Sequence, residues 1–332
     1  MTSPNAPLSA LPGISVILPV LNEESHLEDS ICAILAQDYA GEFDVILALG
    51  PSKDRTNEIA ERLSAENPRI ILVSNPTGRT AAGLNLALHR STREIIVRVD
   101  AHAEIPYNYL QLIVEVLADT GAVNVGGVMG AEGVTLFESA VAAAMRSPFG
   151  VGGSRFHIGG KAGFVDTVYL GAFLRQAVVD VGGFDERFIR AQDWELNYRL
   201  RESGGKIYFD PRLHVTYRPR PNFRRLAKQY FEYGRWRRVI ARKYPETINY
   251  RYLAPPLALI GTVLSLFAGA LIDPSLYLPA ATYFTFIAIT PLFISKDLIH
   301  YPVLVFILPT MHFSWGFGFL TSPRKLVPDS LR

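Results

Sequence analysis

The sequence predicts an α/β protein with a mostly parallel sheet, followed by C-terminal transmembrane helices. Strand-like and helix-like segments alternate through the first 200 residues, which is the pattern of βαβ units. Two uncharged runs of 20 residues follow, at 253–272 and 275–294, and each is long enough to cross a bilayer as a helix. A single cysteine in 332 residues excludes a disulfide-rich module and a Cys-rich metal site.

The expected strands are short runs of β-branched and apolar residues, at 14–18, 43–49, 70–73, 94–99, 123–128, 165–170, 206–209 and 213–217. Helical patterns separate the first of these strands, at 23–37, 54–66, 79–90 and 106–118. Sheets of this kind bind ligands beyond the carboxyl ends of their strands. We therefore expect the functional site in the segments 19–24, 50–56, 75–79 and 100–104.

The charge is unevenly distributed along the chain. The 33 Lys and Arg and the 31 Asp and Glu give a net charge of +2. Residues 212–251, here called the basic collar, hold 12 of the basic residues and two acids, so they carry +10 and the rest of the chain carries −8. The acidic body and the adjacent hydrophobic runs argue against a nucleic-acid partner. Because the collar precedes the first hydrophobic run, the positive-inside rule places the body in the cytoplasm.

Residues 222–244 have the pattern of an amphipathic helix. Aromatic and aliphatic side chains recur at three- and four-residue steps from Phe223 to Tyr244, opposite a basic face. The pattern is typical of a helix that lies in the membrane interface. A soluble helix packed on the sheet is the alternative.

The third uncharged run, 299–320, contains two prolines and two histidines. Three full crossings would place Arg324, Lys325 and Arg332 outside the cytoplasm, against the positive-inside rule. A re-entrant or surface-lying third segment is the alternative, and the sequence does not decide between them. The N-terminal residues lack the basic and apolar segments of a signal peptide. We therefore expect a multi-pass protein of the inner or plasma membrane with a cytoplasmic catalytic domain.

Candidate site residues lie in three segments. The fourth strand runs into Asp100 and His102, and a carboxylate and an imidazole at one strand end suit a divalent cation that bridges a diphosphate. Arg79 opens a helix, where a cation and the helix N-terminus can hold a phosphate. Asp193 lies in the first turn of a later helix beside Trp194, and an aromatic neighbour suits a sugar pocket. For both aspartates the alternative is a helix cap.

Several long motifs occur in one order along the chain: ISVILPVLNEESHLEDSI, NPTGRTAAGLNLAL, IIVRVDAH and GGFDERFIRAQDWELNYRLRESGG. In these motifs the chain resembles the inverting nucleotide-sugar glycosyltransferases of family 2, which have the GT-A fold. RVDAH, GFVDTVYLGAF, DPRLHVTYRPRP and YGRWRRV make it most similar to the ExoA-like group of succinoglycan-type exopolysaccharide glucosyltransferases. The resemblance covers about residues 13–260.

The resemblance implies roles for particular residues. Asp193 stands at the family's general base, which deprotonates the acceptor hydroxyl. Asp100 and His102 stand at the metal-binding DxD positions, with Mn²⁺ or Mg²⁺ as the expected cofactor. The donor is expected to contact Pro19, Glu23, Arg79 and Asp100. We expect the acceptor or membrane lipid to contact Trp194, Arg218, Arg220, Arg224, Arg235 and Trp236.

The chain departs from the family pattern in two places. Residues 49–56 read LGPSKDRT where the family commonly reads DDGSTDGT, so the early acid that contacts uracil is missing. Residues 232–236 read EYGRW, which keeps the Arg-Trp of the distal QxxRW motif but not its Gln. The first departure leaves the identity of the base open, and the second argues against processive synthesis.

The sequence therefore predicts a membrane-anchored inverting glycosyltransferase. We expect transfer of a hexose, glucose from UDP-glucose, to a polyprenyl-diphosphate-linked saccharide in exopolysaccharide or cell-surface glycan synthesis. Two alternatives stay open: a polyprenyl-phosphate sugar synthase that uses lipid phosphate as acceptor, and a catalytically inactive nucleotide-sugar-binding membrane scaffold. The expected division is an extension at 1–12, a GT-A catalytic domain at 13–221, an interfacial region at 222–251 and a membrane domain with two to three hydrophobic helices at 252–332.

Overall fold

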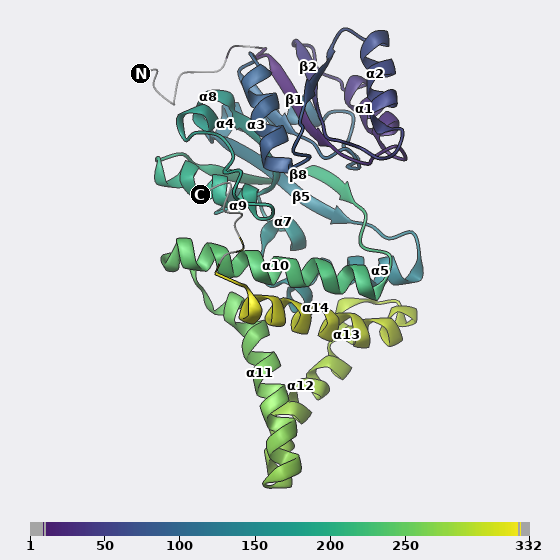
Figure 1. Cartoon of the computed structure of the whole chain (residues 1–332), viewed down its shortest axis with the longest axis vertical. Helices are drawn as coiled ribbons and strands as arrows, with labels where there is room; N and C mark the ends of the chain where they lie inside the picture. The colour runs from purple at the N-terminus through teal and green to yellow at the C-terminus, as the bar shows by residue number, and fades with distance from the viewer. Residues whose placement is uncertain (1–8, 10, 325, 327–332) are drawn as a thin grey trace. The chain divides into compact units, whose positions relative to one another are not determined.

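The computed structural model describes residue 9, residues 11–324 and residue 326 (Figure 1). The expected extension at residues 1–12 falls largely outside these residues, as do Lys325 and Arg332. The chain divides into two compact units. We call residues 1–130 and 159–217 the sheet unit, and residues 131–158 and 218–332 the helical unit.

The sheet has eight strands within the described residues, in the order β3-β2-β1-β4-β7-β5-β8-β6. The first half is parallel and consists of β1 (Ile14–Val20), β2 (Phe43–Leu49), β3 (Ile70–Ser74) and β4 (Ile95–Arg98). The second half consists of β5 (Asn124–Ala131), β6 (Gly163–Phe164), β7 (Tyr169–Leu174) and β8 (Ile207–Tyr217). Strand β7 is antiparallel to both β4 and β5. The carboxyl ends of β1–β4 therefore meet at one edge, as βαβ units require.

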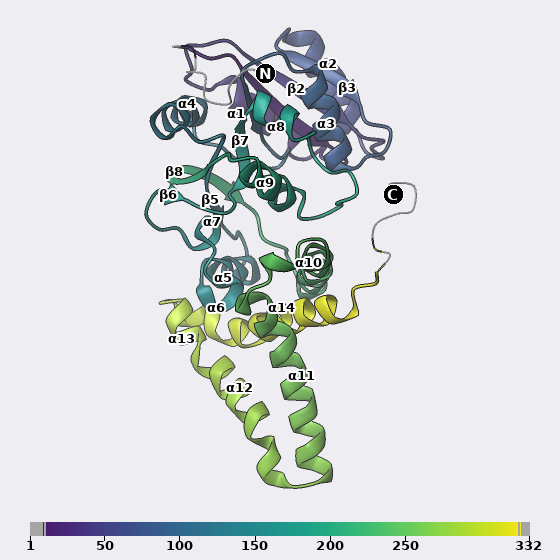
Figure 2. The same cartoon turned by 90° about the vertical axis from the view of Figure 1, so that its left-hand side faces the viewer.

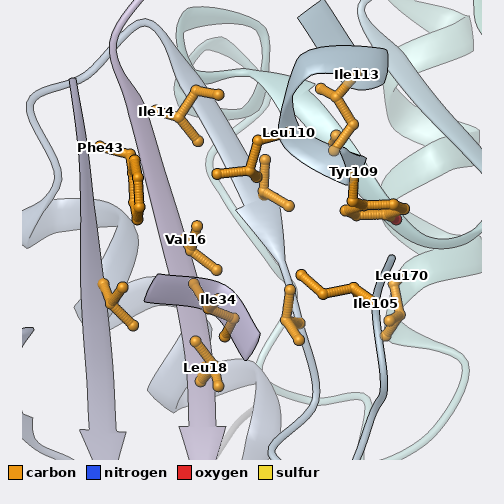
Figure 3. Close-up of a cluster of buried hydrophobic side chains, with 14 of the residues drawn as sticks. Ile14, Val16, Leu18, Ile34, Phe43, Ile105, Tyr109, Leu110, Ile113 and Leu170 are labelled. Carbon is orange, nitrogen blue, oxygen red and sulfur yellow. The ribbon is translucent and has the colours of Figure 1, made fainter. Parts of the chain in front are cut away.

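Helices cover both faces of the sheet. One face packs against α1 (Leu27–Leu35), α2 (Thr56–Glu66) and α4 (Tyr109–Thr120), and the other against α3 (Thr80–Arg90), α8 (Arg175–Asp180) and α9 (Gln192–Glu202). Figure 3 shows part of the first cluster, in which Ile14, Val16 and Leu18 of β1 lie among side chains of α1 and α4. Ile17 of the same strand belongs to the second cluster. Burial on both faces explains why these strands are continuous apolar runs.

The expected strands 14–18, 43–49, 70–73 and 94–99 match β1–β4 to within two residues at each end. Two expectations in the second half were wrong. The expected strand 165–170 is mostly the connection between β6 and β7, and only its last two residues belong to a strand, β7. The expected strands 206–209 and 213–217 are the single strand β8, because the Asp210 carboxylate accepts a hydrogen bond from the Arg212 backbone N–H (2.9 Å) and carries the chain past Pro211.

Strands β5 and β8 approach so closely at Gly127 that no side chain fits there. A Cβ on Gly127 would lie 1.7 Å from the carbonyl oxygen of Leu213. We expect Gly127→Ala to destabilise the protein by about 3 kcal/mol, because a backbone atom must move to admit the methyl group. The matched control is Gly261→Ala in α11 (Tyr250–Leu271), where nothing lies within 4 Å of the added carbon. Thermal unfolding of purified protein measures both, and equal midpoints for the two variants would contradict the close approach.

In the helical unit, α11 and α12 (Leu278–Ile289) form a hairpin joined by a 3₁₀ turn at Pro274–Tyr277. The Ser265 hydroxyl of α11 donates a hydrogen bond to the carbonyl of Leu276 (2.6 Å) and accepts one from the backbone N–H of Ala280 (3.0 Å). Ser265 therefore links α11 to the turn and to the first residues of α12. Three segments among the described residues are long and apolar enough to cross a membrane: Tyr250–Leu271, Pro274–Ile294 and Leu298–Thr321. They coincide with the three uncharged runs of the sequence.

Helix α14 (Tyr301–Thr321) lies along α10 (Phe223–Lys243) and runs in the same direction. Phe231 contacts the ring of Phe317 (centroids 5.8 Å apart), and further along Arg242 donates to the carbonyl of Ser322 (2.8 Å). The helices approach closely because Gly234 and Gly318 face the partner backbone, where a Cβ would lie 2.0 Å from a carbonyl oxygen. Figures 1 and 2 show α14 beside α10 and at a steep angle to the α11–α12 hairpin.

Residues 131–158 belong to the helical unit, although the sequence placed them in the domain 13–221. They form α5 (Leu136–Met145), α6 (Pro148–Val151) and α7 (Arg155–Ile158). Helices α5 and α6 pack against α14, and α5 buries a continuous alanine-rich segment that gives no signal of its partner in the sequence. The unit is completed by α13 (Pro291–Ile294) and two 3₁₀ turns, at Pro245–Thr247 and Leu298–His300. The functional division at residue 221 stays a prediction.

Candidate active site

Three charged side chains meet at the carboxyl end of β4. Arg98 is the last residue of the strand, and its side chain is only 5% exposed. Its Nε and Nη2 atoms both donate to Oδ1 of Asp100, at 3.2 and 3.0 Å. Its Nη1 atom donates to Oδ1 of Asp193, which comes from the first turn of α9. One guanidinium therefore joins the two carboxylates that the sequence predicts to hold the metal and to act as base.

The local structure around α9 fixes the position of Asp193. Ala191 at the N-cap has φ 61°, in the left-handed region that costs a residue with a Cβ about 1–2 kcal/mol. The helix is anchored by buried Leu196 and Leu200 against the sheet. Glu195, whose side chain is fully buried, pairs with Arg199 (2.7 Å) one turn later. The packing of α9 thus maintains the strained backbone conformation of Ala191, and this conformation brings the Asp193 carboxylate to Arg98.

Burial and charge act in opposite directions on this cluster. Burial raises the pKa of Asp193 above its usual range, the positive charge of Arg98 opposes this, and the negative charge of Asp100 adds to it. For Arg98, burial alone would lower the pKa, but the carboxylates of Asp100 and Asp193 raise it above its usual range. Arg98 therefore stays charged, while Asp193 is a stronger proton acceptor than an exposed aspartate. These are the properties of a general base held by a fixed cation.

Glu23 and His102 form a second pair at the same edge of the sheet. Oε1 of Glu23, in the loop after β1, lies 3.0 Å from Nδ1 of His102, in the loop after β4. A carboxylate that accepts the Nδ1 proton of a neutral imidazole leaves the lone pair on Nε2, which is the usual arrangement of a metal-binding histidine. The structure thus brings Glu23, which is predicted to contact the nucleotide-sugar donor, into contact with His102, which is predicted to bind the metal.

The segment 49–56 forms hydrogen bonds with the loop that carries Glu23. The backbone N–H of Glu23 donates to Oγ1 of Thr56 (2.7 Å), and the N–H of Glu24 donates to a carboxylate oxygen of Asp54 (3.3 Å). The side chain of Asn22 accepts from the N–H of Lys53 (2.8 Å), and Asn22 itself has φ 56°. Residues at the family's uracil-contacting segment therefore position the loop after β1.

A cavity of about 380 Å³ opens at the ends of β2 and β3. Its lining includes Leu49 and Gly50, the positions at which the early acid is missing, together with Asn57, Glu61 and Asn75. Asn57 donates to the carbonyl of Gly50 (3.2 Å). In the family pattern an acid directly after β2 would contact the base. In this chain the polar groups that line the cavity come instead from α2 and from the loop after β3.

The other predicted donor ligands lie along the same edge. Pro19 lies within β1, in register with Ala48 of β2. Arg79 is the N-cap of α3, and its carbonyl accepts a hydrogen bond from the side chain of Asn75 (3.0 Å). The structure does not bring Arg79 into the Arg98 cluster, because β3 lies three strands from β4 in the sheet order.

A metal site made by protein side chains alone is absent from the described residues, since no three His, Cys, Asp or Glu gather suitably. Asp100 and His102 offer one carboxylate and one imidazole from a single strand end, with Glu23 behind the imidazole. That donor set fits a divalent cation which takes its remaining ligands from a diphosphate and water. The residues present therefore suit a cation that arrives with the donor.

The predicted acceptor residues are divided between the two units. Trp194 of the sheet unit stacks on Tyr198 (centroids 5.7 Å apart). Arg218 pairs with Glu132 (3.8 Å), and Arg235 pairs with Glu232 (2.9 Å). Arg220 precedes α10 in the helical unit, which also contains Arg224 and Trp236.

Trp236, which the sequence predicts to contact lipid or acceptor, is buried within the helical unit. Its side chain is only 2% exposed, because the apolar stripe of α10 packs within the helical unit, largely against α14. Leu226, Tyr230 and Ile240 of the same stripe are buried as well. The expected amphipathic helix is therefore present, but another helix of the chain covers much of the face that was assigned to the membrane.

Sequence reasoning missed Arg98, whose side chain organises the cluster. A signal was present, since Arg98 is a charge within the apolar strand sequence IIVRV. A buried charge in such a strand requires a partner. The sequence could not identify Asp193 as that partner, because 95 residues separate the two.

Comparison with known proteins gives related sequences and a related fold. The model of the family described as Glycosyl transferase family 2 matches residues 15–181. The chain is 34% identical over 224 residues to "Succinoglycan biosynthesis protein ExoA" of Rhizobium meliloti (strain 1021), which covers 67% of this chain and 68% of the relative. It is 24% identical over 239 residues to a dolichyl N-acetyl-α-D-glucosaminyl phosphate 3-β-D-2,3-diacetamido-2,3-dideoxy-β-D-glucuronosyltransferase of Methanococcus voltae, covering 69% of this chain and 74% of the relative.

Among solved structures, a mannosyltransferase from Pyrobaculum calidifontis in complex with GDP-Man and Mn²⁺ superposes with a TM-score of 0.68. The sequences are 21% identical, and the match covers 96% of this chain and 89% of the mannosyltransferase. At this identity the likeness concerns the fold, which is the GT-A fold expected from the sequence.

Proposed function

Because this chain belongs to glycosyl transferase family 2, we propose that it is an inverting hexosyltransferase that acts on a lipid-linked acceptor at the membrane. The donor is a nucleotide sugar, with UDP-glucose as the expected one, and the acceptor is a polyprenyl-diphosphate-linked saccharide. The single observation that supports the proposal is that Arg98 joins Asp100, the proposed metal ligand, to Asp193, the proposed base.

Asp193 is the proposed general base. Inversion requires one displacement at the anomeric carbon, and a single carboxylate suffices to accept the proton of the attacking hydroxyl. Burial raises the pKa of Asp193, which strengthens it as an acceptor, while Arg98 keeps it ionised. Trp194, adjacent to the base, is proposed to contact the acceptor sugar.

Asp100 and His102 are the proposed holders of Mn²⁺ or Mg²⁺, with Glu23 orienting the imidazole. A bound cation supplies neutralisation of the charge that develops on the departing nucleoside diphosphate. Arg79, at the N-terminus of α3, is proposed to approach the same diphosphate. The solved mannosyltransferase of similar fold is in complex with GDP-Man and Mn²⁺, which supports a divalent cation beside the proposed donor site of this chain.

The cavity beyond β2 and β3 is proposed to receive the nucleotide base. Its lining includes Leu49 and Gly50 in place of the family's acid, with Asn57 and Glu61 nearby. An amide and a carboxylate present a different hydrogen-bonding set from a single aspartate. A base other than uracil is therefore as compatible with this cavity as uracil.

We propose that two helices enter the bilayer and that α14 lies in the interface. Helix α10 carries eight Lys and Arg in 21 residues, so it cannot cross a hydrocarbon core. Since α14 follows α10 along its length, it shares that depth. The α11–α12 hairpin would then place both of its ends on one side, and Arg324 would lie with the basic collar, in agreement with the positive-inside rule. A cytoplasmic catalytic unit at the inner or plasma membrane follows.

Metal removal tests the proposal. We expect purified full-length protein in lipid nanodiscs to transfer sugar from a nucleotide donor to a polyprenyl-diphosphate saccharide, to lose this activity in EDTA and to regain it with added Mn²⁺. Asp100→Asn should raise the Mn²⁺ concentration required for half-maximal activity by about 10-fold or more, because a neutral amide is a weaker ligand. Full activity in EDTA would contradict the proposed metal role. Efficient transfer to bare polyprenyl phosphate would instead favour a polyprenyl-phosphate sugar synthase.

A further inference from the structure

A groove runs between α10 and α14 within the helical unit. Its volume is about 610 Å³, and its lining includes Phe223, Arg224 and Ala227 of α10 and Phe306, Pro309 and Phe313 of α14. Phe223 and Ala227 are one helical turn apart, as are Phe306 and Pro309, so each helix presents one face to the groove. The small Ala227 side chain on α10 faces the side of the groove that Phe306 and Phe313 of α14 line, and this leaves the space open.

The groove has one charged group in its described lining, the guanidinium of Arg224. Arg218 and Arg235 pair with Glu132 and Glu232, whereas Arg224 has no carboxylate within ion-pair distance among the described residues. The Arg224 residue is also exposed. The groove is therefore mostly apolar, and it carries one cation, Arg224, that forms no ion pair with a carboxylate among the described residues.

We propose that this groove holds the polyprenyl chain of the lipid-linked acceptor, with Arg224 at its phosphate. The assignment rests on the proposed function and adds the place of the lipid. A polyprenyl phosphate is a long, single, apolar chain with an anionic group at one end, which matches an apolar channel beside an unneutralised cation. A helix pair in the membrane interface lies at the depth of lipid phosphates, so the anionic group and Arg224 share a level.

Matched variants separate groove binding from general membrane contact. Phe306 lines the groove and is 64% exposed, whereas Phe317, on the same helix, is 53% exposed and lies outside it. We expect Phe306→Ala to raise the KM for a long-chain polyprenyl-diphosphate saccharide by about 10-fold, and Phe317→Ala to leave it within about 2-fold. Arg224→Gln should raise the same KM by a similar factor, and Arg225→Gln, at an exposed neighbour outside the groove, should not.

The test uses full-length protein in nanodiscs of zwitterionic lipid, with thermal unfolding of each variant as a check on folding. A second acceptor carries the same saccharide diphosphate on a short alkyl chain. Phe306→Ala should leave the kinetics with this acceptor unchanged, because it cannot fill the groove. Equal effects of Phe306→Ala and Phe317→Ala would overturn the groove assignment, as would an effect that disappears when anionic phospholipid is added. If the wild type transfers sugar to neither acceptor, the proposed function itself is contradicted. This outcome differs from failure of the groove assignment, in which the wild type is active.

Discussion

Asp193→Asn is expected to abolish sugar transfer while leaving donor binding largely intact. The amide keeps the size of the side chain but cannot accept a proton from the acceptor hydroxyl, and loss of a general base costs about 10²- to 10⁴-fold in kcat. Titration calorimetry with the nucleotide-sugar donor should give a Kd within about 2-fold of wild type, since the donor is assigned to other residues of the sheet edge.

The matched control for this variant is Asp180→Asn. Asp180 is an exposed helix carboxylate that accepts a hydrogen bond from Gln176 (2.7 Å) and lies outside the cluster. Its replacement should leave kcat and donor affinity unchanged. A rate near wild type for Asp193→Asn would remove Asp193 from the role of base, and a lost donor affinity would make it a binding residue instead.

Arg98→Met is expected to be the most damaging single change in the sheet unit. The methionine fills a similar space but leaves the carboxylates of Asp100 and Asp193 partly buried without their cation. Breaking a buried ion pair by removing one partner costs about 3–5 kcal/mol. Urea or thermal unfolding should report this loss. The control is Arg93→Met, because Arg93 also pairs with two carboxylates, Glu42 and Asp44, but its side chain is 34% exposed and the pair is expected to contribute about 1 kcal/mol or less.

The pH dependence distinguishes positioning of the base from a purely structural role of Arg98. The guanidinium lowers the pKa of Asp193 against the effect of burial, so its removal should raise that pKa further. Transfer requires the ionised carboxylate, and activity is therefore lost as the pH falls through the pKa of Asp193. For the Arg98→Met protein that remains folded, the fall of kcat on the acid side of the pH profile should therefore begin at a higher pH than in the wild type. An acid limb at the wild-type pH would leave Arg98 with a structural role alone.

The parallel half of the fold could be predicted because its signals are local. Strands β1, β2 and β4 are buried on both faces, so each appears as an apolar run. The edge strand β3 is only partly buried, but its sequence IILVS is still a short apolar run. The second half was less predictable. Leu170 and Gly171 in β7 both have positive φ, which no apolar pattern reports, and β8 continues through Pro211 because of a side-chain hydrogen bond.

The candidate site could be predicted residue by residue but not as a cluster. Asp100, His102, Glu23 and Asp193 were all expected from the motifs that contain them. Their connections were not, since Arg98 reaches Asp193 across 95 positions and Glu23 reaches His102 across 79. The same limit applies to α10, whose periodic apolar face predicted a membrane surface. The close approach of Gly234 and Gly318 to backbone of the facing helix shows that much of this face has a protein partner.

The most direct test of a lipid-linked glycosyltransferase is incorporation of labelled sugar into lipid. Membranes that contain wild-type protein, and membranes that contain Asp193→Asn at the same level, are incubated with a panel of labelled nucleotide sugars and extracted with organic solvent. We expect label from one donor in the lipid fraction of the wild type, and none above background in the variant. Label confined to the aqueous fraction for every donor, or equal lipid labelling by the variant, would contradict the account.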